Sequence, residues 1–121
     1  KSPKEFVFGI DVIRNVAEYV KSFYEQNIDF YLFDLRNFLS ISENKNCIYH
    51  SLLMAKEKGF LNSEVCSKYN QVYKQSEIIR MLSIKFSLVK SVDVLKSLYR
   101  SIIKLLDMEQ ELLPNILKCL N

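Results

Sequence analysis

Glycine and proline are scarce in this chain, which contains two of each among its 121 residues. Proteins on average use about 7% glycine and about 5% proline. The shortage argues against collagen-like segments, flexible linkers and all-β folds with many tight turns. Since 49% of the residues are hydrophobic and 26% are charged, we expect one soluble domain of long helices, with a core large enough to fold without disulfides or metal.

Paired cysteines and long apolar runs are also missing from the sequence. Cys47, Cys66 and Cys119 make an odd number without a CxxC pair, which fits reduced thiols better than a disulfide framework. The longest uncharged stretch, around residues 47–55, is about half of the roughly 20 apolar residues that a transmembrane helix needs. We therefore expect a cytoplasmic protein without a transmembrane segment. Because the first residue is Lys1, we expect residues 1–121 to be a single helical domain excised or processed from a longer chain.

Helical spacing of apolar residues is clearest in the N-terminal part of the chain. Ser2-Pro3-Lys4-Glu5 offers a cap oxygen, a proline for the first helical position and a glutamate that reaches back, which together predict a helix start. We expect this helix to contain Gly9 in its interior. A second helix, capped by Asn27 or Asp29, is expected to extend to about Ile41. The core stripe of the first helix comprises Phe6, Ile10, Ile13, Ala17, Val20 and Tyr24.

Cap residues divide the rest of the chain into further helices. A third helix over about 43–58 is expected to end at Gly59, which adopts the left-handed conformation without steric cost. The pair Asn62-Ser63 restarts the helical pattern. We expect a break near Lys90-Ser91, where Ser91 caps a fifth helix. Pro114 is expected to end or kink that helix and to leave a short tail helix behind it.

These patterns predict an all-α fold, an irregular bundle of five to six helices. A minor alternative is an α+β fold with a small two-stranded ribbon, because two segments alternate apolar residues with other residues. A ribbon of two strands is marginally stable by itself, and the flanking caps favour helix. The alternating apolar residues are Phe6, Phe8, Ile10 and Val12 in one segment and Leu82, Ile84, Phe86 and Leu88 in the other.

Signatures of catalysis and metal binding are weak. His50 is the only histidine, so any Ser-His or Cys-His arrangement depends on that residue alone. A zinc site could combine His50 with Cys47, Cys66 and Cys119, but the paired ligands of strong zinc motifs are missing. Three small apolar cysteines and a histidine on a helix are the simpler interpretation. Since the glycine motifs of nucleotide-binding loops do not occur either, we expect a non-enzymatic protein with no metal site and no cofactor.

Aromatic residues suggest a binding surface on the second helix. Phe30, Phe33 and Ile41 fall at helical spacing opposite that helix's main apolar face, so the helix is apolar on two sides. We interpret these three as partner-binding residues of an adaptor that docks another protein or a second copy of itself. Burial under a neighbouring helix is the alternative, because central helices of a bundle are also apolar all round.

Basic residues suggest an alternative function. Residues 68–104 contain eight bases and two acids, a local balance of eight minus two, or +6. An anion could lie along these cations, whether a phosphoinositide-bearing or other anionic membrane surface or a nucleic-acid backbone. Lysines that merely solvate an amphipathic helix are the plain alternative. The candidate anion-binding residues are Lys85, Lys90, Lys96, Arg100 and Lys104.

Overall fold

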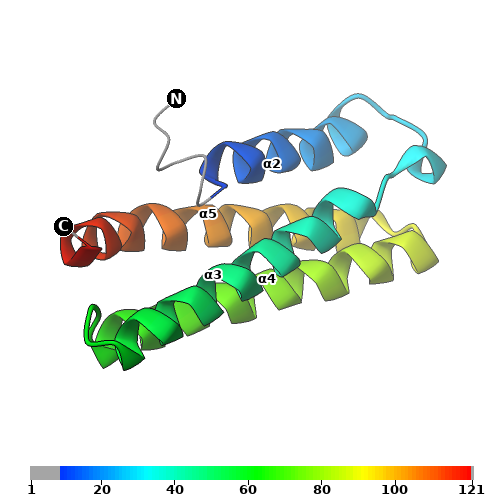
Figure 1. Ribbon diagram of the computed structural model, residues 1–121. Helices are drawn as coiled ribbons and strands as arrows, with labels where there is room; N and C mark the ends of the chain where they lie inside the picture. Colours follow the sequence, from blue (N-terminus) through cyan, green and yellow to red (C-terminus); the bar gives the residue numbers. More distant parts are fainter. Residues whose placement is uncertain (1–8, 121) are drawn as a thin grey trace.

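The computed structural model describes residues 9–120, which form four α-helices and one short 3-10 helix (Figure 1). The all-α prediction is confirmed, whereas the expected count of five to six helices is too high for the described residues. No strand occurs among residues 9–120, and the segment proposed as half of a ribbon, 82–88, lies within a helix. The elements are α2 (Ile10–Glu25), η1 (Phe30–Leu32), α3 (Arg36–Glu57), α4 (Ser63–Val89) and α5 (Val92–Leu120).

The four α-helices pack side by side in the spatial order α2, α5, α4, α3. Helix α4 contacts both α3 and α5, and α5 also contacts α2, whereas α2 and α3 touch each other little. Figure 1 shows α5 running between α2 and α4, with α3 alongside α4. Residues 58–62 and 90–91 connect α3 to α4 and α4 to α5, so these connections lie at opposite ends of the bundle. The seam between α2 and α3 is therefore loose compared with those between α3 and α4, α4 and α5, and α2 and α5.

Periodic apolar residues form the core where the sequence indicates it. In α2, Ile10, Ile13 and Val20 are almost fully buried, as the spacing of four and three residues requires. In α5, Leu98 and Ile102 are completely buried. The same inward face of α5 continues with Leu105, Leu112 and Ile116.

The first helix begins later than its cap motif predicts. Gly9 has φ 73° and is the N-cap of α2, so it precedes the helix instead of lying inside it. This left-handed conformation is one that glycine adopts readily and other residues adopt at a cost. The predicted start at Ser2-Pro3 lies outside the described residues.

Residues 27–41 do not form one helix, contrary to expectation. Two aspartates interrupt the helical backbone, because Asp29 Oδ1 accepts the Tyr31 N–H and Asp34 Oδ1 accepts the Arg36 N–H, both at 3.0 Å. Such local side-chain bonds compete with helix formation. The Asp34 N–H also donates to the hydroxyl oxygen of Tyr19 at 2.8 Å, which ties the link to α2. Helix α3 then starts at Arg36 and runs through the expected boundary at residue 42.

The later boundaries mostly follow the sequence. Gly59 has φ 83° just after α3, and the Asn62 side chain accepts the Val65 N–H at the start of α4. Lys90 ends α4 in the left-handed conformation, as the predicted break requires. Pro114, however, does not end α5, which continues to Leu120. Burial of Ile116 beyond the proline keeps the last turns on the core and offsets the backbone hydrogen bond that proline removes.

Candidate functional site

The three residues predicted to form a docking stripe lie against the core. Ile41 is only 3% exposed. The ring of Phe33 lies 4.8 Å from that of Phe86 and 4.9 Å from that of Phe38, centroid to centroid, and Phe30 packs 5.1 Å from Phe86. The expected exposed stripe is therefore wrong, because the three residues lie in η1, in the link after it and in α3, and their packing turns them inward.

Other apolar residues are exposed at the same end of the bundle. Tyr31 in η1 is 82% exposed and Leu88 in α4 is 79% exposed. Figure 1 shows η1 and the turn between α4 and α5 at one end of the molecule. Spacing in the sequence did not reveal these residues, although large apolar side chains next to predicted helix breaks are a usable signal. This surface, called the apolar end below, comprises Tyr31, Leu32, Leu88, Val89 and Val92.

A hollow of about 390 Å³ opens at the apolar end, between the last turn of α2, η1 and the start of α5. Lys90 lines it, with its Nζ 5.1 Å from the centroid of the Tyr31 ring, and Lys96 Nζ lies 5.9 Å from the centroid of Tyr24, another lining residue. Attraction between a cation and a ring face holds both lysines there. The lining residues of this end hollow are Phe23, Tyr24, Asn27, Ile28, Asp29, Phe30, Tyr31, Lys90 and Val92.

Backbone strain is concentrated at the end hollow. Asn27 and Lys90, with φ of 55° and 53°, are the non-glycine residues with positive φ in the described chain, and both line the hollow. Asparagine tolerates this conformation, whereas lysine at a helix C-terminus occupies a position that usually suits glycine. The Lys90 ammonium donates to the Ser87 carbonyl oxygen, which stabilises the end of α4. Strain of this kind is often retained where a side chain is needed for function.

The predicted anion-binding residues occupy three places. Lys90 lines the end hollow, and Lys96, Arg100 and Lys104 lie exposed along the outer side of α5. Lys85 is exposed on α4. None of these five residues forms an ion pair with an acid among residues 9–120. The α5 cations Lys96, Arg100 and Lys104 are called the basic stripe below.

Tyr24 lines the end hollow, and its ring contacts Lys96, the first residue of the basic stripe. Burial, together with Tyr99 and Glu25, raises its pKa, while Lys21 and Arg100 act in the opposite direction. The phenol is therefore neutral at physiological pH and can donate a hydrogen bond. Edge-to-face contact with the Tyr99 ring, at a centroid distance of 6.2 Å, fixes the Tyr24 ring against α5.

A second polar group lies inside the bundle. Lys45 Nζ of α3 is 2.6 Å from Glu109 Oε1 of α5, both side chains are 1% exposed, and the Tyr69 hydroxyl of α4 donates to the same oxygen at 3.1 Å. Burial lowers the pKa of Lys45 and raises those of Glu109 and Tyr69. The sequence patterns did not point to this cluster. The sequence feature that could have revealed it is a lysine and a glutamate at positions where the helical spacing calls for core residues. Lys45, for example, follows the buried Ile41 by four residues.

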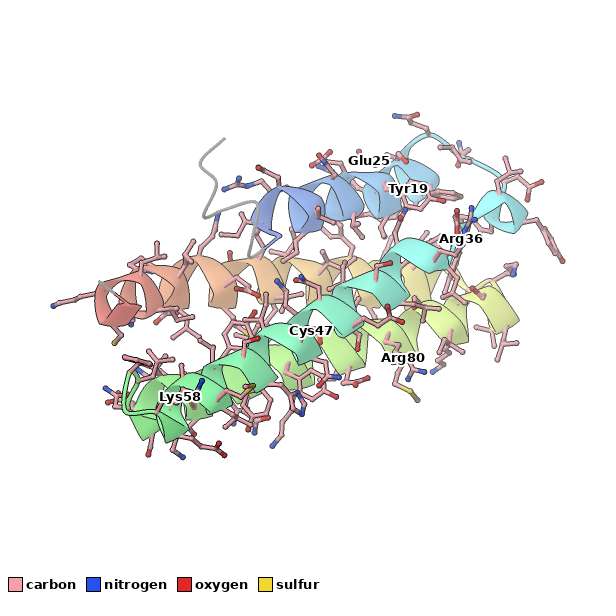
Figure 2. The ribbon with its side chains drawn as sticks, viewed as in Figure 1. Tyr19, Glu25, Arg36, Cys47, Lys58 and Arg80 are labelled. Atoms are coloured by element: carbon pink, nitrogen blue, oxygen red, sulfur yellow. The ribbon has the colours of Figure 1, made fainter. Side chains whose placement is uncertain are left out.

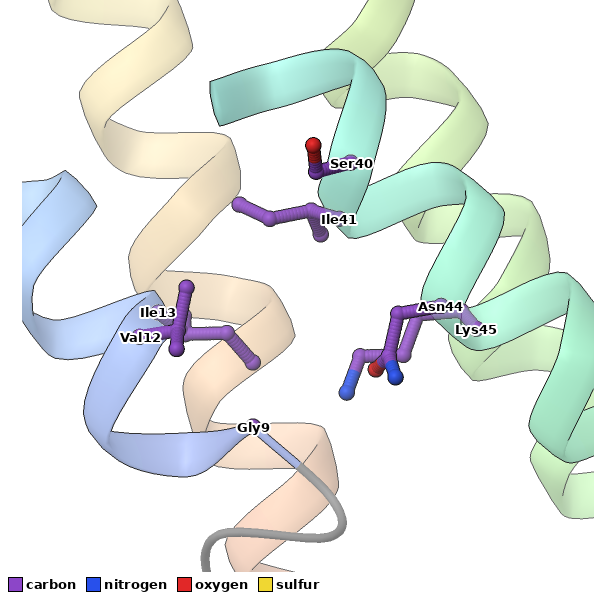
Figure 3. Close-up of a pocket in the computed structure, with 7 residues that line it drawn as sticks. All are labelled: Gly9, Val12, Ile13, Ser40, Ile41, Asn44 and Lys45. Atoms are coloured by element: carbon purple, nitrogen blue, oxygen red, sulfur yellow. The ribbon is translucent and has the colours of Figure 1, made fainter. Parts of the chain in front are cut away.

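A groove of about 400 Å³ lies beside this polar cluster, in the loose seam between α2 and α3 (Figure 3). Val12, Ile13 and Ile41 make it mostly apolar, and Asn44 and Lys45 point toward Gly9 across it. A Cβ atom at Gly9 would stand 3.7 Å from Lys45 Nζ. Since the Lys45 ammonium already pairs with Glu109, the groove offers apolar contact more than charge.

The histidine and the cysteines do not converge. His50 is exposed on α3, and its Nδ1 lies 2.8 Å from the Asn46 carbonyl oxygen. Cys66 is buried and donates its S–H to the Leu52 carbonyl oxygen, whereas Cys47 and Cys119 are exposed on different helices (Figure 2 labels Cys47). Within residues 9–120, no three His, Cys, Asp or Glu side chains are grouped so that they could hold a metal ion.

The fold and the candidate site define an all-α helical bundle with an exposed apolar end and a basic stripe that leads away from it. None of the helices in residues 9–120 combines the length and the apolar character needed to cross a bilayer. Comparison with protein-family models, curated proteins and solved structures found no match to this chain.

Proposed function

We propose that this chain is a binding module that docks a partner protein through its apolar end. The observation that carries the proposal is the gathering of large, exposed apolar side chains from η1, α4 and α5 at one end of the bundle. Single exposed apolar residues are ordinary on a protein surface, but a group of them marks an interaction site. Covering such a surface is favourable by about 25 cal/mol for each Å² of apolar area removed from water.

The surroundings of the apolar end also support a protein partner. Interfaces between proteins commonly have an apolar centre and a charged, wet rim. Around the apolar end, Lys85 and Asp93 are exposed, and Arg36 binds Asp34 with a shortest N–O distance of 2.8 Å. Hydrogen bonds from Arg36 lower the pKa of Asp34 to about 2, so this rim carboxylate stays ionised. A rim that carries both positive and negative charges suits a partner protein, because protein surfaces also carry charges of both signs.

Direct binding to a polyanion is the second candidate function. The basic stripe favours it, because its three cations lack acidic partners among the described residues. The acids beside the end hollow disfavour it, since Asp29 lines the hollow and Asp93 follows Val92 directly. A nucleic-acid backbone or an anionic bilayer would be repelled by these carboxylates.

Selection from a random-peptide phage library tests the proposed function, because such a library offers the surface many different side-chain combinations at once. Selected peptides are expected to shift the backbone amide NMR signals of η1 and of the turn between α4 and α5. The substitution Leu88→Asp should abolish their binding, because it places a charge at the centre of the interface. Phe60→Asp is the matched control, since Phe60 is 67% exposed in the connection between α3 and α4, at the other end of the bundle.

Two results would contradict the proposed function. One is peptide binding that shifts amide signals only elsewhere on the bundle. The other is equal loss of binding in Leu88→Asp and Phe60→Asp while both variants keep the helical circular dichroism of the original chain.

A further inference from the structure

We infer that the partner of this module is an acidic segment that places an apolar anchor side chain in the end hollow and its carboxylates along the basic stripe. This inference rests on the proposed function, because it describes what the apolar end binds. It joins two features of the surface: a ring-lined hollow and a row of cations that starts beside it.

The charge of the basic stripe favours an acidic ligand. Residues 96–104 contain three cations and no acid. Arg100 donates to the Ser97 hydroxyl oxygen at 3.1 Å, which leaves its remaining guanidinium N–H groups able to bind a carboxylate. A partner carboxylate near these side chains would gain electrostatic energy from more than one cation at a time.

The spacing of the basic stripe fits an extended peptide. Its members follow one another every four residues, which on a helix that rises 1.5 Å per residue separates them by about 6 Å along the axis. In an extended peptide, side chains on one side repeat every two residues, or about 6.6–6.8 Å. Acids at alternate positions of the partner would therefore face Lys96, Arg100 and Lys104 in order.

The end hollow suits the apolar anchor. Its volume of about 390 Å³ falls within the range of about 300–1,000 Å³ for protein ligand sites. Phe23, Tyr24, Phe30 and Tyr31 supply ring surfaces to its walls, and an aromatic or large aliphatic side chain can pack against such surfaces. Because Lys96 lies over the Tyr24 ring, a residue anchored in the hollow stands beside the start of the basic stripe.

Lys90 places a positive charge beside the hollow that would hold the anchor side chain. Its side chain lies over the Tyr31 ring at the edge of the hollow, and its backbone has the left-handed conformation that glycine adopts more readily. A lysine at this position supplies a cation in the lining of the hollow, in addition to Lys96 over the Tyr24 ring. A carboxylate adjacent to the anchor residue can therefore pair with Lys90 as well as with the basic stripe.

A protein segment fits these features better than a nucleic acid or a lipid surface. Asp29 lines the hollow, and Glu25 lies close enough to Tyr24 to raise its pKa. A polymer with a negative charge on every unit would meet both carboxylates, whereas a peptide can place an apolar or amide side chain opposite them. The exposed aliphatic side chains of Leu88 and Val89 likewise match apolar residues of a protein.

The composition and charge dependence of the selected peptides test this inference. Peptides that bind the apolar end are expected to carry acids at alternate positions next to an aromatic or aliphatic residue. The triple variant Lys96→Gln, Arg100→Gln, Lys104→Gln should weaken their binding about tenfold, as the loss of three exposed ion pairs predicts, and reduce its salt dependence. The matched control is the triple variant Lys56→Gln, Lys58→Gln, Lys118→Gln. It removes the same charge from exposed sites outside the basic stripe, in α3, in the connection after α3 and in the last turn of α5. This control should leave peptide binding nearly unchanged.

The outcomes separate this inference from the proposed function. Peptides that need Leu88 but show no excess of acids, and that bind the triple variant as well as the original chain, would refute the acidic partner and keep the docking site. Failure of Leu88→Asp to affect any selected peptide would refute both. Tighter binding of oligothymidylate or of phosphatidylserine vesicles than of any selected peptide, lost in the triple variant, would assign the basic stripe to a polyanion and overturn the inference.

Discussion

Replacing Lys45 by methionine is expected to lower the free energy of unfolding by about 3–5 kcal/mol at neutral pH, because it leaves a buried carboxylate without its cation. Lys45 Nζ lies 2.6 Å from Glu109 Oε1, and both side chains are 1% exposed. Methionine keeps most of the apolar volume of lysine, so the lost charge dominates the effect. A domain of this size is typically stable by about 5–15 kcal/mol, so the variant should remain folded but be markedly weakened.

The cost of Lys45→Met should depend on pH in a definite direction. Burial raises the pKa of Glu109 above its ordinary value of 4.5, and Lys45 opposes that rise, so removal of the ammonium raises the pKa further. A carboxyl whose pKa is raised in the folded state binds its proton more tightly there than in the unfolded chain. Stability therefore falls as the pH rises from the unfolded pKa to the folded one. The difference between variant and original chain should be smallest in acid and grow toward neutrality.

Urea unfolding followed by far-ultraviolet circular dichroism measures both effects, and the lack of tryptophan makes that signal the natural choice. The double variant Lys45→Met, Glu109→Leu should recover most of the loss, since a buried ion pair replaced by apolar groups is often neutral or stabilising. The exposed Lys56→Met is the matched control and should change stability by less than about 0.5 kcal/mol. A cost below about 1 kcal/mol for Lys45→Met, equal in acid and at neutral pH, would refute the reasoning that a buried, ionised pair joins α3 to α5.

Two further predictions concern the apolar end and its neighbours. Lys90→Gly should raise the free energy of unfolding by about 1 kcal/mol, because glycine relieves the left-handed strain at the end of α4, and it should weaken binding of the selected peptides. Urea unfolding and peptide titration measure these two effects. A destabilised variant that keeps full peptide binding would contradict the role given to Lys90. Ile41→Ala should lower the free energy of unfolding by about 2–5 kcal/mol, because it truncates a buried side chain. The control Phe60→Ala changes an exposed side chain and should lower it by less than about 0.5 kcal/mol. Equal losses of stability in thermal or urea unfolding would show that Ile41 does not belong to the core.

Local chemistry makes several boundaries of the fold predictable from the sequence. Left-handed backbone at Gly59, the side-chain cap at Asn62 and the break at Lys90 each depend on residues within one turn of the boundary. The inward stripe of α5 is equally predictable, because its apolar residues keep helical spacing whatever lies opposite. The link between η1 and α3 is not, since its conformation depends on the bond from the Asp34 N–H to Tyr19, which is fifteen residues distant.

The candidate site likewise has parts that the sequence predicts and parts that it does not. Lys96, Arg100 and Lys104 share a helix, so their spacing alone places them on one side. The burial of Ile41, the inward packing of the half-buried Phe33 and the exposure of Tyr31 do not follow from spacing, because burial depends on which helices cover a segment and on where the chain leaves the helix. Nor does the sequence show that Lys90 lines a hollow together with Tyr24, or that Lys45 pairs with Glu109.

From the sequence alone come the all-α class, the amphipathic faces and the row of cations on α5, since all three depend on residues a few positions apart along one helix. Only the tertiary structure decides that Phe30 and Phe33 pack inward while the apolar end stays exposed, and that a buried ion pair joins α3 to α5. The physical reason is that burial and charge pairing are settled by the packing of helices distant in sequence, a choice that local spacing leaves open.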